Sequence, residues 1–255
     1  MLVIRAEQMD MLKEAALRSF EDAMVRHLYL FAPHHCEGIG EENVRRVIRL
    51  GLERSAAYGF TARGPVRFYL ELMFMFGSHF DTDPQLPRWT AEILQDGTID
   101  DQMLRADRLH ERTLDYLRVV AGPDNAYARK AVQNFRVIAA QPLPFSAETL
   151  VNGLLTAMQQ LYPERYTYVG EEALRALIEE GRTMAERQAM MTVRGVTLCS
   201  LLMFELGHGC FNDPLYPWIA RTFDGQTDDP NQRVQRLERR VMAYLELILK
   251  RLAQG

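Results

Sequence analysis

The feature that most constrains the fold of this chain is an internal repeat at a spacing of 130 residues. The segment GEENVRRVIRLG (40–51) aligns with GEEALRALIEEG (170–181), and LMFMFG (72–77) aligns with LMFELG (202–207). Without a gap, 14 of the 48 positions in the window 40–87 are identical in its copy. Because the matched segments keep their order along the chain, we interpret the pattern as the duplication of one structural unit.

Each repeated unit is predicted to be helical throughout. Apolar residues recur every three or four positions, and the alternation that is typical of β-strands is nearly absent. We expect a long first helix over 11–30 and two further helices over 40–59 and 64–76. Charged helices are then expected to begin near Asp100 in the first unit and near Asp229 in the second.

A shared Asp-Pro step lies in the last part of each unit. Asp83 and Asp213 correspond at the 130-residue spacing, and each is followed by a proline. An aspartate followed by proline is favoured at helix starts, where the two serve as N-cap and first helical residue. We therefore expect these aspartates to cap short helices that Trp89 and Trp218 anchor to the core.

The predicted fold class is all-α, with about eleven helices arranged as two sets of five and a connector. We divide the chain into a first helical repeat (1–122), a connecting helix (123–141) and a second helical repeat (142–255). Short connections favour antiparallel packing of neighbouring helices. We expect the two helical subdomains to pack together around a pseudo-twofold axis, with a cleft between them as the natural binding surface.

Composition excludes several functional classes. The 30 basic and 34 acidic residues give a net charge of −4, which argues against direct nucleic-acid binding. No segment has the roughly 20 apolar residues of a membrane span, and no signal peptide is visible. The three cysteines form no CxxC pair and suit a reducing compartment. We expect a cytoplasmic protein that does not bind a membrane.

The run His34-His35-Cys36-Glu37 contains residue types that can ligate zinc. Adjacent side chains point in different directions, however, and tetrahedral sites usually draw on separated pairs of ligands. The corresponding segment 164–167 (Glu-Arg-Tyr-Thr) keeps none of these four residues. We interpret the run as a polar loop between helices.

Two further loops carry side chains that could bind a metal. They are His79, Asp81 and Asp83 in the first unit, and His208, Cys210 and Asp213 in the second. Only the Asp83 and Asp213 positions correspond at the repeat spacing, and a capping role explains them without a metal. A paired-histidine motif such as HExxH is absent. We therefore predict no metal-ligating residue.

Catalytic signatures are absent from the sequence as well. It has no GxSxG elbow, no GxGxxG fingerprint and no P-loop, so we predict no catalytic residue and no cofactor. Basic helix faces occur at 45–49 and 233–240. We interpret them as solvated surface with pairs four residues apart, such as Glu41–Arg45.

A set of short motifs in the first unit consists of Gly40–Gly51, Leu72–Gly77, Phe80–Pro84, Leu86-Pro87 and Trp89. This pattern resembles a group of bacterial all-helical proteins encoded beside type VI secretion effectors. The resemblance is clearest over about the first 120 residues, and Arg88 between Pro87 and Trp89 departs from the pattern. It implies a non-enzymatic protein that binds a toxic effector or its delivery machinery.

Three functions remain open on these grounds. The leading hypothesis is an immunity protein that binds and neutralises a cognate toxin effector. The second is an effector chaperone or adaptor that loads a toxin onto the secretion spike, with adaptor or spike proteins as partners. The third is a helical metal-dependent hydrolase built on one of the histidine-containing loops. Homodimerisation is compatible with each of them.

Overall fold

The computed structural model describes residues 6–86, 89–224 and 229–253, and all regular structure in these ranges is helical. It comprises thirteen α-helices, of which eleven have seven or more residues, and two short 3-10 turns. The predicted all-α class with about eleven helices is confirmed. None of the described helices combines the length and apolar character that crossing a lipid bilayer requires.

The helices follow one another with short connections. The first six are α1 (Ala6–Phe31), α2 (Pro33–Ile39), α3 (Glu41–Ala57), α4 (Arg63–Phe76), α5 (Trp89–Leu94) and α6 (Gln102–Val120). The connecting helix is α7 (Ala126–Ala140). The last six are α8 (Leu150–Leu161), α9 (Pro163–Val169), α10 (Glu171–Arg187), α11 (Val193–Leu206), α12 (Pro217–Thr222) and α13 (Pro230–Leu252).

Three consecutive helices have the same bounds in both halves of the chain after the 130-residue shift: α2 and α9, α3 and α10, α4 and α11. The way α3 packs on α4 is repeated where α10 packs on α11. Gly51 of α3 faces Leu70 of α4, and Gly181 of α10 faces Ser200 of α11, so that a methyl group at either glycine would collide with the neighbouring helix. These agreements fit the predicted duplication, which stays a prediction together with its domain boundaries.

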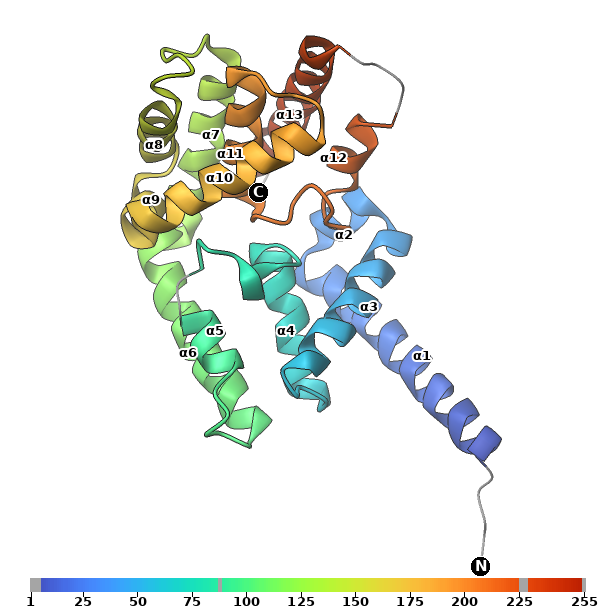
Figure 1. Cartoon of the computed structure of the whole chain (residues 1–255). Helices are drawn as coiled ribbons and strands as arrows, with labels where there is room; N and C mark the ends of the chain where they lie inside the picture. Colours follow the sequence, from blue (N-terminus) through green and yellow to red (C-terminus); the bar gives the residue numbers. More distant parts are fainter. Residues whose placement is uncertain (1–5, 87–88, 225–228, 254–255) are drawn as a thin grey trace, which may run out of the picture.

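The two halves meet side by side in Figure 1, with α9 against α6 and α2 close to α12. Buried apolar side chains from both halves form one continuous cluster, whose largest fully buried members include Tyr69, Phe80 and Phe204. The N-terminal part of α1 extends away from this body (Figure 1). Its side chains at Met11, Leu12 and Leu17 are exposed.

The halves approach each other closely at two glycines that end α4 and α11. Gly77 has φ 96° and Gly207 has φ 94°, values that side chains rarely tolerate. A Cβ added to Gly77 would lie 2.8 Å from the carbonyl oxygen of Leu206, and one added to Gly207 would lie 2.7 Å from that of Phe76. Backbone therefore packs directly on backbone where the halves meet.

Asp83 and Asp213 secure this contact from opposite sides. The Ser78 N–H donates to Asp213 Oδ2 at 2.7 Å, and the His208 N–H donates to Asp83 Oδ2 at 2.8 Å. Ser78 and His208 correspond at the 130-residue spacing, so the two bonds are reciprocal. The second oxygen of each carboxylate accepts the N–H two residues later in its own loop, at Gln85 or Leu215.

The prediction that these aspartates are helix N-caps followed by proline is wrong. The helices after them begin at Trp89 and at Pro217, whose N-cap is Tyr216. The carboxylates instead accept from backbone N–H groups of the opposite half, the buried one of Ser78 and the partly buried one of His208. Of the two tryptophans, Trp89 is buried in the core as predicted, whereas Trp218 is only half-buried.

Alanine substitutions at four glycines test the backbone contact between the halves. Gly40 and Gly170 also have positive φ values, but an added Cβ would meet nothing within 4 Å there. We expect Gly40→Ala and Gly170→Ala to cost only the backbone strain, about 1–3 kcal/mol. Gly77→Ala and Gly207→Ala add a collision with backbone and should lower the free energy of unfolding by about 2 kcal/mol more. Urea denaturation measures the difference, and equal losses at all four positions would contradict it.

Candidate functional site

In the first candidate metal loop, the carboxylate of Asp81 is hydrogen-bonded to other side chains of the protein. Asp81 is buried, receives hydrogen bonds from the Arg54 guanidinium and accepts the Tyr58 hydroxyl at 2.9 Å. Asp83 lies in the contact described above and faces His208 of the other half. The two carboxylates therefore serve different partners and do not converge on one point.

In the second candidate loop, His208 also contacts other side chains of the protein. His208 lies against the ring of His79, with ring centroids 6.2 Å apart, and its Nδ1 is 3.0 Å from the Glu180 carboxylate. Burial alone would lower the pKa of His208, but the Glu180 carboxylate, the charge of Asp83 and the His79 carbonyl together outweigh burial and raise it. Cys210 is fully buried, which raises the pKa of its thiol. Within the described ranges, no three His, Cys, Asp or Glu side chains gather as a metal ion would require.

The prediction that the His34–Glu37 run is a loop between helices is wrong, because the run lies within α2. Pro33 occupies its first turn and Gly40, with φ 80°, ends it. The Cys36 thiol is buried and donates to the Leu28 carbonyl, while His34 and Glu37 are exposed and pair across one turn, with His34 Nδ1 3.7 Å from the Glu37 carboxylate. The predicted Glu41–Arg45 pair is confirmed, with Arg45 Nε 2.9 Å from the Glu41 carboxylate.

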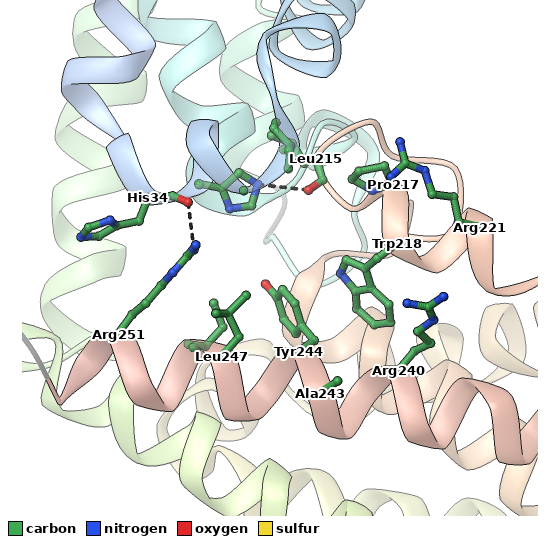
Figure 2. Close-up of a pocket in the computed structure, with 14 residues that line it drawn as sticks. His34, Leu215, Pro217, Trp218, Arg221, Arg240, Ala243, Tyr244, Leu247 and Arg251 are labelled. Carbon is green, nitrogen blue, oxygen red and sulfur yellow. Dashed lines mark hydrogen bonds between the residues drawn. The ribbon is translucent and has the colours of Figure 1, made fainter.

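The sequence did not reveal a pocket between α2 of the first half and α12 and α13 of the second (Figure 2). Its volume is about 270 Å³. The cations that line it are Arg221, Arg240 and Arg251, and none of its fourteen lining residues is acidic. Such a concave, partly aromatic site with few charged groups is typical of ligand-binding pockets.

One wall of the pocket is aromatic. The rings of Trp218 and Tyr244 are stacked, with centroids 5.0 Å apart and an interplanar angle of 24°. The indole Nε1 of Trp218 is buried and has no hydrogen-bond partner among the described residues. In Figure 2 the hydroxyl of Tyr244 points into the space beneath Leu215. Two potential hydrogen-bonding groups therefore accompany the apolar ring faces.

The opposite wall connects the two halves through α2. His35 Nε2–H donates to the Leu215 carbonyl at 3.1 Å, and the Arg251 guanidinium donates to the His34 carbonyl at 2.9 Å. The ring of His35 packs edge-on against Tyr216. Burial lowers the pKa of His35, so this imidazole is neutral near pH 7 and the positive charge of the pocket comes from the arginines.

The pocket escaped prediction because its three arginines come from different helices or different turns. The 233–240 segment was interpreted as a solvated face, and Trp218 as a core anchor. One signal was available in the sequence: Arg240, Tyr244, Leu247 and Arg251 follow one another at spacings of four, three and four, which places them on one face of a helix. Such a face combines aromatic, aliphatic and cationic side chains.

A second cavity, of about 340 Å³, lies between α6, α7, α9 and α11. Arg165 and Glu205 line it, and the Arg165 guanidinium donates to the Glu205 backbone carbonyl at 3.4 Å. Burial raises the pKa of the Glu205 carboxyl to about 7 against the opposing effect of Arg165. The Oε1 atom of Glu205 has no hydrogen-bond partner within the described part of the chain.

No protein-family model, no curated protein and no solved structure matches this chain.

The shifted pKa of Glu205 predicts how stability depends on pH. The folded-state pKa of about 7 exceeds the ordinary value of 4.5. The contribution of the protonated Glu205 to the free energy of unfolding is therefore fully present below pH 4.5 and is lost as the pH rises through 7. Glu205→Gln should therefore stabilise the protein at pH 8.5, by at most about 3 kcal/mol, and change little at pH 4.5. Denaturation at the two pH values measures this effect.

Glu186→Gln is the matched control, because Glu186 is exposed and lies on α10. We expect its effect on stability to be within about 0.5 kcal/mol at both pH values. A Glu205→Gln effect that does not change with pH would show that the buried carboxyl is not the titrating group.

Proposed function

We propose that this chain is a non-enzymatic protein-binding scaffold that captures and neutralises a cognate toxin effector of type VI secretion. The observation that carries the proposal is the pocket between α2, α12 and α13, where Trp218, Tyr244 and Arg240 lie together. Tryptophan, tyrosine and arginine are the side chains that most often dominate the binding energy of protein interfaces. The resemblance of the 40–89 segment to proteins encoded beside type VI effectors supports the choice of partner.

The exposed part of α1 supports the same interpretation. Met11, Leu12 and Leu17 have exposed fractions of 70%, 57% and 51% on a helix that projects from the body (Figure 1). These side chains point to different sides of the helix, and a partner that surrounds the helix would remove them from water. A toxin that contacts both α1 and the pocket would lie across the first half of the chain, and inhibition would follow from steric occlusion of the toxin.

Co-expression tests the proposal. We expect the chain to restore growth of bacteria that produce the effector encoded beside its gene, and to co-purify with that effector. Arg221→Glu combined with Arg240→Glu should reduce both effects, because the two substitutions reverse charge at the pocket. Arg112→Glu on α6 is the matched control, since Arg112 is exposed and outside the pocket.

The outcomes separate immunity from the alternative role of effector chaperone or adaptor. A chain that binds the effector without restoring growth, and that is required for effector stability or export, is an adaptor. A chain that neither binds the effector nor protects against it contradicts both roles.

A further inference from the structure

We propose that the pocket between α2, α12 and α13 binds an acidic peptide segment, one or two of whose apolar side chains enter the pocket while carboxylates meet the arginines at its edge. This inference rests on the proposed function and names the kind of partner segment that the site would recognise. It is carried by the unbalanced charge, the apolar walls and the size of the pocket.

The charge of the pocket is not neutralised within the described chain. Arg221 and Arg240 are exposed and make no ion pair or hydrogen bond with a described residue, while Arg251 donates to a backbone carbonyl. The acidic residues nearest in sequence, Glu37, Glu238 and Glu246, do not line the pocket, and the last two pair with Arg194 and Arg136. In Figure 2 the side chain of Arg221 extends from α12, and those of Arg240 and Arg251 extend from α13. Guanidinium groups presented in this way favour carboxylates, which they can bind in bidentate fashion.

The interior of the pocket favours an apolar group over a free anion. Leu215, Pro217, Leu247 and Ile248 line it together with the stacked rings of Trp218 and Tyr244, and a small inorganic anion would leave these surfaces in contact with water. A peptide can supply both an apolar side chain for the interior and carboxylates for the arginines. Its backbone groups can also form a hydrogen bond with the Tyr244 hydroxyl, which points into the pocket in Figure 2.

The volume of about 270 Å³ limits the occupant further. Pockets for drug-sized molecules usually measure about 300–1,000 Å³. The smaller space suits one or two side chains of a segment that continues over the surface, with Arg221 and Arg240 on its path. The same occupant would contact α2 of the first half and α13 of the second, and so would favour the arrangement in which they meet.

The test uses the full chain and a labelled peptide of sequence Glu-Leu-Asp-Phe-Glu, with Gln-Leu-Asn-Phe-Gln as its uncharged counterpart. Fluorescence polarisation should show saturable binding of the acidic peptide and at least tenfold weaker binding of the uncharged one. Arg240→Gln and Arg221→Gln should each weaken binding of the acidic peptide by roughly tenfold, the effect of losing one charge-assisted hydrogen bond. Arg112→Gln should leave it unchanged.

A second readout places the peptide in the pocket. The chain has two tryptophans, and Trp89→Phe leaves Trp218 as the only one, so that binding should change its fluorescence. If Trp89→Phe does not fold, competition with iodide quenching in the unmodified chain reports the same event, because Trp89 is buried. Equal binding of both peptides, no effect of the arginine substitutions, or equally effective displacement by inorganic phosphate would overturn the inference.

The result is distinguishable from failure of the proposed function. If the acidic peptide binds as expected but the chain gives no protection against the effector, the pocket assignment stands and the function fails. If protection persists while the peptide does not bind, the function stands and the pocket assignment fails.

Discussion

The structure depends on a place where two backbone segments touch with no side chain between them. Gly77 and Gly207 end equivalent helices, and the carbonyl oxygen before each glycine blocks the space in which a Cβ of the other would lie. This contact fixes how closely the halves approach. It accompanies the contact of α9 with α6 and the hydrogen bonds of His35 and His34 in α2 to the second half, where α2 forms one wall of the pocket.

Two buried carboxylates make that contact specific as well as close. A buried charge is costly unless it is hydrogen-bonded, and Asp83 and Asp213 each accept one N–H from the opposite half and one from their own loop. Sliding one half along the other would leave two carboxylates and two N–H groups without partners. Apolar contacts elsewhere in the core are less directional, so this polar pair defines the relative position of the halves.

The helices were predictable from sequence because their causes are local. The 3.6-residue apolar period and the glycines at the ends of α3, α4 and their counterparts depend on neighbours along the chain, and the repeat showed each pattern twice. The functions of Asp83 and Asp213 were not predictable, because their decisive partners lie about 125 and 135 residues away. The pocket was missed for the same reason, since α2 and α13 are at opposite ends of the chain.

Equivalent positions of the two halves carry different residues where they line different cavities. Position 35 is His and position 165 is Arg, and each lines a cavity where one half meets the other. Beside Arg165 lies the buried carboxyl of Glu205, whose pKa of about 7 allows it to become a counter-charge as the pH rises. Beside the neutral His35, the arginines of α12 and α13 have no acidic counterpart among the lining residues. An acidic partner is therefore directed to the pocket beside His35, whose lining, unlike that of the Arg165 cavity, contains no carboxyl group that could offset its arginines.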